Sequence, residues 1–247
     1  MVARRLRRYE KSSEISYAEG VFATLELLTA RPDDVEAVLV SSRGEPNAGV
    51  KKIREICAAR GVGLTVDDRA MERLSPRGSH LAVGVFRKYS TEISTEDDHV
   101  VLVEPADMGN LGTIFRTMLG FGVRDLAVVR PAADAFDPRV IRASMGALFR
   151  ASFSYFDSFG DYARRFPRKV YSFMIDGTTR VDDLRFQAPC ALVFGNESSG
   201  LGETFRALGE SVRIGQTEAV DSLSLPVAVA VALYERARRG VGAPGGP

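Results

Sequence analysis

The stretch HVVLVEPADMGNLGTIFRTMLGFGVRDLAVVR, residues 99–130, decides the fold class. It opens with an apolar run, passes through a polar loop to Asn110, and carries a helical pattern from Leu111 to Gly120 before a second apolar run, DLAVVR. Strand, helix and strand in this order indicate two parallel strands joined by a helical crossover. Neither run alternates apolar and polar residues, as expected when helices cover both faces of a sheet. We therefore predict an α/β fold with a parallel sheet.

Apolar runs and helical patterns continue on both sides of this stretch. Downstream, the sequence predicts a helix from Pro138 to Phe149, strands at KVYSFMI, CALVFG and SVRIG, and a closing helix from Ser224 to Arg239. Upstream, residues 12–86 predict a smaller α/β unit that contains a helix near residues 17–30, the strand VEAVLVS, a helix from Val50 to Arg60 and the strand LAVGVF.

A polar segment, KYSTEISTEDD at residues 88–98, separates the two patterns and has little to bury. We therefore place a small α/β domain at residues 14–90, a linker at 91–98 and a larger α/β domain at 99–239. Residues 1–13 are expected to form a basic N-terminal extension. Residues 240–247, GVGAPGGP, are expected to form a flexible tail because glycine and proline dominate them.

Composition restricts the possible functions. The 33 Lys and Arg residues nearly balance the 32 Asp and Glu residues, so any nucleic-acid site must be local. The N-terminal cluster Arg4, Arg5, Arg7 and Arg8 could contact phosphates, or could equally be a solvated tail. The two cysteines are far apart, and no disulfide or metal site is expected. No apolar run of membrane-spanning length and no secretion signal is visible, so we expect a cytoplasmic protein.

Three polar segments follow apolar strands in the second half, where parallel α/β sheets bind ligands: EPADMGNLGTIFRT, LVFGNESSGLG and RIGQTEAVDSLSLPVAVAVALYE. In the first, Asn110 and Arg116 could face one cavity, or Asn110 could be a helix cap and Arg116 a solvated cation. In the second, small residues expose backbone amides, and Glu197 could hold an arginine. The third could equally be a buried helix with a serine cap. A Walker-type GxxxxGK is missing, and no glycine fingerprint follows the first strand of a βαβ unit, which disfavours a nucleotide-dependent dehydrogenase.

Taken together, NLGTIFR, FGNESSGL and SLSLPVAVAVALYE resemble the three motifs of the SpoU (TrmH) RNA methyltransferases, and DPRVIRASMGALFR between them is also similar to that family. The resemblance implies S-adenosylmethionine as cofactor, a homodimer that completes the site, and a C-terminal deep trefoil knot. It assigns the cofactor to Gly195, Ile214 and Leu223, with Asn196, Gly200 and Ser224 nearby. It assigns catalysis to Asn110, Arg116, Glu197 and Ser224, with Arg116 nearest the chemistry.

The resemblance also bears on the substrate. Residues 14–90 are similar to the small RNA-binding domain of ribosomal-RNA members, which makes His80 and Arg142 candidate RNA contacts beside the N-terminal arginines. The expected activity is methylation of a ribose 2′-hydroxyl in ribosomal RNA, and transfer RNA is the nearest competitor. This chain has Ser-Leu-Ser at 222–224 where Ser-Leu-Asn is usual, and His-Leu-Ala at 80–82 where His-Gln-Gly is usual. A catalytically weak assembly factor that binds cofactor or RNA is therefore the alternative.

Overall fold

The computed structural model describes residues 6–74 and 80–239, which divide into two compact units. One unit comprises Met1–Tyr89 and Asp134–Arg150, and the other comprises Ser90–Ala133 and Ala151–Pro247. The segment 134–150 therefore belongs by its contacts to the first unit, although the sequence pattern placed it within the larger domain. No helix of the described residues is long and apolar enough to span a membrane.

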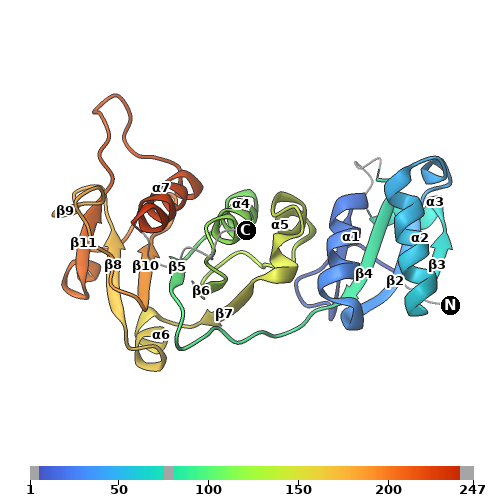
Figure 1. Cartoon of the computed structure of the whole chain (residues 1–247), viewed down its shortest axis with the longest axis horizontal. Coiled ribbons are helices and arrows are strands. Elements are labelled where there is room, and N and C mark those ends of the chain that lie inside the picture. The colour runs from blue at the N-terminus through green and yellow to red at the C-terminus, as the bar shows by residue number, and fades with distance from the viewer. Residues whose placement is uncertain (1–5, 75–79, 240–247) are drawn as a thin grey trace. The chain divides into compact units, whose positions relative to one another are not determined.

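The first unit is built on a four-stranded sheet in the order β1-β4-β2-β3. The strands are β1 (Ile15–Glu19), β2 (Val35–Val40), β3 (Leu64–Val66) and β4 (Ala82–Arg87), and all neighbours are antiparallel except β2 and β3. Helices α1 (Val21–Ala30) and α2 (Ala48–Arg60) pack on one face, and α3 (Asp68–Leu74) packs on the other (Figure 1). Two 3₁₀ helices, η2 (Pro32–Asp34) and η3 (Ser42–Gly44), flank β2. Along β2, Val38 and Val40 contact the α1–α2 layer, whereas Ala37 and Leu39 contact the α3 layer.

The helix predicted near residues 17–30 is wrong at its start. Residues 15–19 form β1, which pairs with β4, and the chain turns into α1 at Gly20. Gly20 has φ 101°, a backbone conformation that favours glycine and ends the strand before the helix begins. The short helix α3 was not predicted, since its seven residues complete fewer than two full turns.

The helix predicted from Pro138 to Phe149 is also interrupted. The structure has α5 (Pro138–Ala143), capped by the Asp137 side chain, and then a 3₁₀ helix, η4 (Ala147–Arg150). Met145 and Gly146 lie between them with φ values of 51° and 77°. Two consecutive left-handed residues cannot continue an α-helix, so the helical pattern in the sequence is broken at this point.

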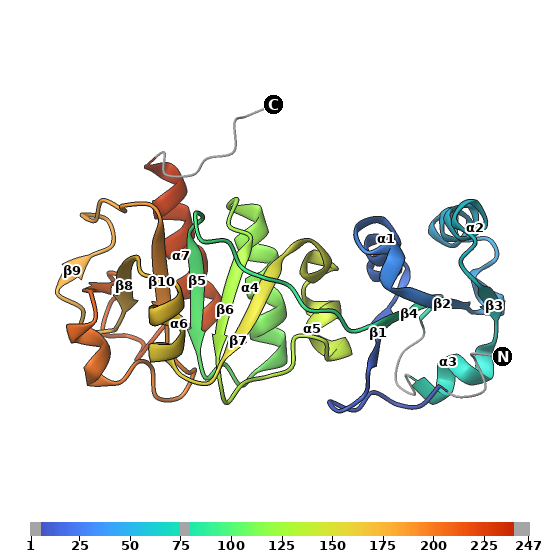
Figure 2. The same cartoon turned by 90° about the horizontal axis from the view of Figure 1, so that it is seen from below.

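The second unit contains a seven-stranded, fully parallel sheet in the order β7-β6-β5-β10-β8-β11-β9. Its strands are β5 (His99–Val103), β6 (Asp125–Val129), β7 (Ser152–Phe156), β8 (Lys169–Phe173), β9 (Thr179–Arg180), β10 (Cys190–Phe194) and β11 (Glu210–Arg213). Helices α4 (Met108–Gly120) and α7 (Leu225–Arg238) lie side by side on one face, and α6 (Phe159–Arg165) lies on the other (Figures 1 and 2). The connection to β11 includes the 3₁₀ helix η5 (Glu203–Ala207). The predicted α/β fold with a parallel sheet is confirmed.

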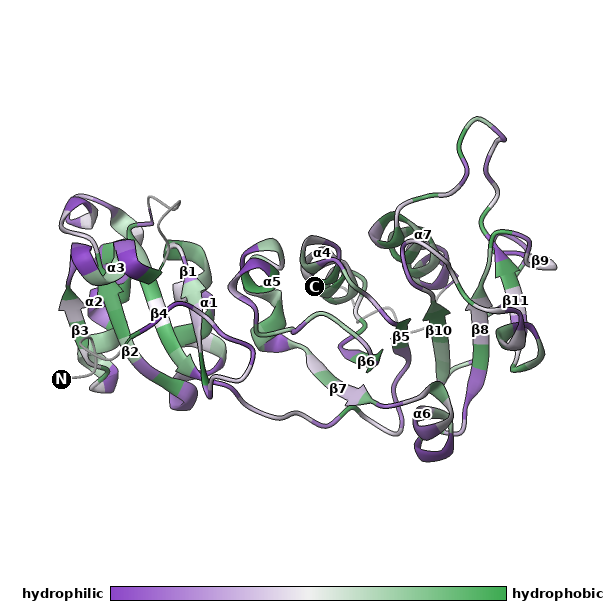
Figure 3. Ribbon diagram, turned by 180° about the vertical axis from the view of Figure 1, so that it is seen from behind, coloured by the Kyte–Doolittle hydropathy of each residue, from purple (hydrophilic) through white to green (hydrophobic). Residues whose placement is uncertain are grey.

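The middle of this sheet is buried on both faces. Strand β10 is buried at every position and hydrophobic along its length (Figure 3), as expected for a covered parallel strand. After β5 the chain continues to β6, which lies on one side of β5 in the sheet. After β10 it continues to β11, which lies on the opposite side, beyond β8. Strands β5 and β10 therefore flank the point where the strand order reverses, and open α/β sheets bind ligands beyond the carboxyl ends of the strands at such a point.

Candidate active site

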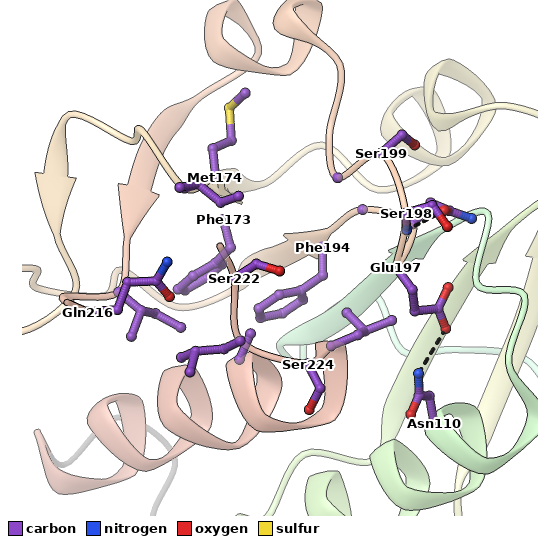
Figure 4. Close-up of a pocket in the computed structure, with 18 of the residues that line it drawn as sticks. Asn110, Phe173, Met174, Phe194, Glu197, Ser198, Ser199, Gln216, Ser222 and Ser224 are labelled. Carbon is purple, nitrogen blue, oxygen red and sulfur yellow. Dashed lines mark hydrogen bonds between the residues drawn. The ribbon is translucent and has the colours of Figure 1, made fainter. Parts of the chain in front are cut away.

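A cavity of about 500 Å³ opens at the carboxyl ends of β8, β10 and β11 (Figure 4). The first turn of α7 and the loops after these strands form most of its wall, and α4 contributes one residue, Asn110. The lining residues are Asn110, Phe173, Met174, Ile175, Phe194, Gly195, Asn196, Glu197, Ser198, Ser199, Gly200, Val212, Ile214, Gln216, Ser222, Leu223, Ser224, Leu225 and Ala228.

Glu197 ties the loop after β10 to the beginning of α4. Its carboxylate accepts hydrogen bonds from the backbone N–H groups of Ala106 (3.2 Å) and Asp107 (3.3 Å). It also accepts one from the side-chain amide of Asn110, at 3.2 Å, and Figure 4 shows these two side chains pointing toward each other. A carboxylate at the N-terminus of a helix is stabilised by the free N–H groups and the helix dipole. Glu197 therefore holds Asn110 and the start of α4 against the cavity.

The loop after β10 is fixed by its own hydrogen bonds. The Asn196 amide donates to the Glu104 carbonyl at 2.7 Å, and its side-chain oxygen accepts the Ser198 N–H at 2.8 Å. Gly195 lies against the backbone of Gly200: a Cβ atom at Gly195 would be 2.1 Å from the Gly200 carbonyl carbon. Only glycine permits this approach. Glu104 has φ 56°, a conformation that is uncommon for a non-glycine residue and occurs at functional sites.

The remaining cavity wall combines aromatic and small polar side chains. The rings of Phe173 and Phe194 stack with their centroids 4.5 Å apart and their planes 13° apart, and both rings line the cavity. Ser224 stands at the N-cap position of α7 without a side-chain capping hydrogen bond. Its hydroxyl can therefore bond a ligand, which the serine-cap interpretation did not foresee. Gln216 bridges its own loop by donating to the Asp221 carbonyl at 3.3 Å.

The structure brings most of the predicted site residues together. All six residues assigned to the cofactor line the cavity: Gly195, Asn196, Gly200, Ile214, Leu223 and Ser224. So do three of the four residues assigned to catalysis, Asn110, Glu197 and Ser224. The residues that the sequence argument missed include Phe173, Met174 and Ile175 at the end of β8. The run KVYSFMI was predicted to be a strand. Because its carboxyl end lies at the same edge of the parallel sheet as the other site residues, the sequence could have indicated these three residues as well.

Arg116 lies elsewhere, and its predicted place in this cavity is wrong for a single copy of the chain. Arg116 is exposed on α4 and does not line the cavity. Six helical residues rotate the side chain by about 600°, which puts it about 120° away from Asn110 around the helix. Glu197 accordingly bonds α4 amides and Asn110 rather than Arg116. Asp107, not Asn110, caps the helix by accepting the Asn110 N–H at 2.7 Å.

The predicted RNA contacts lie in the first unit. Arg7, Arg8 and Arg142 are exposed, whereas Arg4 and Arg5 fall outside the described residues. His80 is largely buried, with its Nε2 atom 3.3 Å from a Glu19 carboxylate oxygen. It lines a cavity of about 280 Å³ together with Ser41, Ser42 and Arg43 among other residues. The RNA role of these residues stays a prediction.

Comparison with known proteins identifies the family. Residues 97–234 match the model of the SpoU rRNA Methylase family. The chain belongs to the SpoU family. The matched region begins just before β5, ends within α7 and includes every residue that lines the cavity.

Among SpoU relatives, the chain is 32% identical over 149 residues to the 23S rRNA (uridine(2479)-2'-O)-methyltransferase of Streptomyces viridochromogenes. That alignment covers 57% of this chain and 52% of the Streptomyces protein, so the chain matches about half the length of that relative. It is 24% identical over 244 residues to the 23S rRNA (guanosine-2'-O-)-methyltransferase RlmB of Acinetobacter baylyi, which covers 92% and 98% of the two chains. The crystal structure of an AdoMet-bound rRNA methyltransferase from Sinorhizobium meliloti matches with a TM-score of 0.77 and 25% identity, over 92% of this chain and 88% of that one.

The cavity of this SpoU protein has the size and chemistry to hold S-adenosylmethionine. Its volume lies within the range of about 300–1,000 Å³ that is usual for cofactor and small-molecule sites. The stacked pair Phe173 and Phe194, with Leu223 and Leu225, supplies an apolar surface for a purine. The hydroxyl groups of Ser222 and Ser224 can bond the polar parts of the cofactor. No group of three His, Cys, Asp or Glu side chains suited to a metal ion occurs within residues 6–74 and 80–239.

Proposed function

We propose that this protein methylates a ribose 2′-hydroxyl of ribosomal RNA in the cytoplasm, with S-adenosylmethionine as the methyl donor. The observation that carries the proposal is the gathering of all three SpoU motifs around one cavity at the reversal point of the parallel sheet. Similarity over nearly the whole length to RlmB of Acinetobacter baylyi, in a chain with its own N-terminal α/β unit, supports ribosomal RNA as the substrate.

The residues of the cavity would bind the cofactor and orient the reacting groups. The loop 195–200, Ile214 and Leu223 would hold the cofactor mainly through backbone groups. S-adenosylmethionine supplies an electrophilic methyl group on a sulfonium that leaves as a neutral thioether. The ribose oxygen gains the new C–O bond and loses its proton to solvent. Placing that oxygen about 3 Å from the methyl carbon provides much of the rate.

Arg116 would stabilise charge rather than accept the proton. A guanidinium group stays protonated at neutral pH and is therefore a poor base. Arg116 would instead bond the phosphate beside the target ribose and stabilise the negative charge that develops on its oxygen.

Since Arg116 is absent from the cavity of its own chain, we propose that it serves the cavity of a second copy in a homodimer. Helix α7, which packs against α4, leaves Val227 and Tyr234 exposed by 46% and 54%. An interface on the α4–α7 face would bury these apolar side chains and carry Arg116 to the neighbouring subunit. A deep trefoil knot in the C-terminal part of the chain remains part of this proposal.

The test has two stages. Calorimetric titration with S-adenosylmethionine should give one site per chain for the wild type and none for Ala228→Phe, whose ring would occupy the cavity. Unmodified transcripts of 23S, 16S and transfer RNA would then be incubated with labelled cofactor. A 2′-O-methyl group makes the adjacent phosphodiester resistant to alkali, so labelled alkali-resistant dinucleotides identify ribose methylation. Labelled mononucleotides would contradict the proposal. Label in transfer RNA alone would mean that the substrate is transfer RNA rather than ribosomal RNA. Cofactor binding without methylation of any transcript would favour an assembly factor.

A further inference from the structure

Four arginines surround an open depression of about 690 Å³ on the first unit. The residues that line it are Leu6, Arg7, Arg8, Arg69, Glu72 and Arg73. Two of the arginines come from the N-terminal segment and two from α3, and all four are exposed. We refer to Arg7, Arg8, Arg69 and Arg73 as the arginine cluster.

The N-terminal part of the cluster is held in place by the core. Leu6 is 7% exposed and packs in the same hydrophobic cluster as Met71 and Leu74 of α3. The Tyr17 hydroxyl donates to the Arg7 carbonyl at 2.6 Å. The backbone of Arg7 is therefore anchored beside α3, and its side chain remains exposed.

The depression has an excess of positive charge, because four arginines and a single carboxylate, that of Glu72, line it. Some exposed arginines elsewhere have carboxylate partners, as in the pairs Arg130–Asp157 and Arg180–Asp182. None of the four cluster arginines has an ion pair with a described residue, and the segments 1–5 and 75–79 contain no Asp or Glu. Arg69 and Arg73 are four residues apart on one helix, an arrangement of like charges that disfavours the helix. A ligand that carries several negative charges would compensate this repulsion.

We propose that the arginine cluster binds the phosphate backbone of the RNA substrate. This inference rests on the proposed function and deepens it, because it assigns RNA binding to a surface of the first unit. Guanidinium groups bond phosphates in a bidentate manner, and such contacts fix the register of an RNA without reading its sequence. With a formal charge of only +1 for the whole chain, a local cluster has to supply the electrostatic part of the affinity.

The salt dependence of RNA binding tests this proposal without requiring methylation. The probe is a fluorescein-labelled RNA stem-loop of about 30 nucleotides, since phosphate contacts are independent of sequence. Anisotropy titrations at several salt concentrations would compare the wild type, Arg69→Gln/Arg73→Gln and Arg69→Lys/Arg73→Lys. The control Lys51→Gln/Lys52→Gln removes the same charge from two exposed positions of α2, on the opposite face of the sheet.

The Gln double variant should bind about tenfold more weakly, and the slope of log K against log salt should fall by about 1.5, the contribution of two phosphate contacts. The Lys variant should keep most of the slope, and the control should keep all of it. Equal losses in the Gln variant and the control would overturn the proposal. Cofactor titration and a thermal melt of each variant would show that the fold and the cavity are intact, so a failure of the proposed methylation is distinguishable from a failure of this surface.

Discussion

Asn110 on α4 donates its side-chain amide to Glu197 in the loop after β10, at 3.2 Å, and so joins two of the three SpoU motifs at one wall of the cavity. The same carboxylate accepts two backbone N–H groups at the start of α4. This geometry gives Glu197 a positioning role, because it holds Asn110 and the helix rather than the arginine that the sequence suggested.

Replacing Glu197 with Gln should lower the free energy of unfolding by about 1–2 kcal/mol, since the amide loses the charge that favours the helix N-terminus. Urea denaturation measures the change, and kcat for RNA methylation should fall at least tenfold, because an NH2 group replaces one of the two oxygens that accept the Ala106, Asp107 and Asn110 N–H groups. Glu203→Gln is the matched control, because it breaks an exposed pair with Arg206 and should cost about 0.5 kcal/mol or less. Equal losses in the two variants would contradict the role given to Glu197.

Gly195 should not tolerate even a methyl group. A Cβ atom there would lie 2.1 Å from the Gly200 carbonyl carbon and 2.2 Å from its oxygen, and two backbone segments cannot separate without opening the loop. Gly195→Ala should therefore abolish measurable binding of S-adenosylmethionine in calorimetry and destabilise the fold by about 1–3 kcal/mol. In Gly202→Ala the new methyl group meets no atom within 4 Å, so binding should be unchanged. Retained affinity in Gly195→Ala would show that this loop does not form the cofactor site.

Strand β10 was predictable because CALVF is an unbroken apolar run followed by glycine and polar residues. β7 and α6 were not predicted, since SFSYF has polar residues within the strand and the helix has only seven residues. The place of Arg116 was not predictable from spacing alone, because residues six apart on a helix point in different directions. The association of residues 134–150 with the first unit depends on tertiary packing, such as the ring contact of Phe86 with Phe136, for which the sequence gives no local signal.

The buried ion pair of Asp98 and Arg236 should be essential for the fold of the second unit. Their side chains are 2% and 5% exposed, Arg236 Nε donates to Asp98 at 2.6 Å, and the Cys190 N–H donates to the other carboxylate oxygen at 2.6 Å. Asp98→Asn leaves a buried guanidinium without its counter-charge and should cost about 3–5 kcal/mol in urea denaturation. Affinity for the cofactor should fall as well, because Arg236 anchors the helix that carries Leu225 and Ala228 into the cavity.

Two further variants separate burial from charge in this prediction. Asp98→Asn/Arg236→Met removes both charges and should recover much of the lost stability. Asp157→Asn breaks the exposed pair with Arg130 and should cost about 1 kcal/mol or less. A loss of about 1 kcal/mol or less in Asp98→Asn would show that the buried pair contributes no more than a surface pair.

Stability should depend on the protonation of His99 in weakly acidic solution. Burial, together with the nearby Arg168 cation, lowers the pKa of His99 from 6.5 to about 4. Its ring nitrogens bond the Tyr162 hydroxyl at 2.9 Å and the Ser94 carbonyl at 2.7 Å. Because the folded state holds this histidine neutral, its contribution is complete above pH 6.5 and is lost as the pH falls toward 4.

The loss amounts to about 3 kcal/mol at most, because burial lowers the pKa of His99 from 6.5 to about 4. Urea midpoints between pH 7 and 4 would show it, and His99→Gln should have a flatter profile over this interval, although it is less stable at pH 7. Parallel profiles for the wild type and His99→Gln would assign the acid sensitivity to other groups.

The proposed service of Arg116 to a neighbouring subunit predicts that two inactive proteins restore activity when mixed. In a mixed dimer, the Arg116→Ala subunit supplies an intact cavity and the Ala228→Phe subunit supplies Arg116. One of the two cavities is therefore complete. Random exchange of subunits makes about half of the dimers mixed, and about a quarter of the wild-type methylation rate should return. Arg116→Lys should stay well below the wild type, because lysine keeps the charge but loses the planar fork that bonds a phosphate in a bidentate manner. No recovery after mixing, with exchange verified by native mass spectrometry, would mean that Arg116 acts within its own chain or not at all.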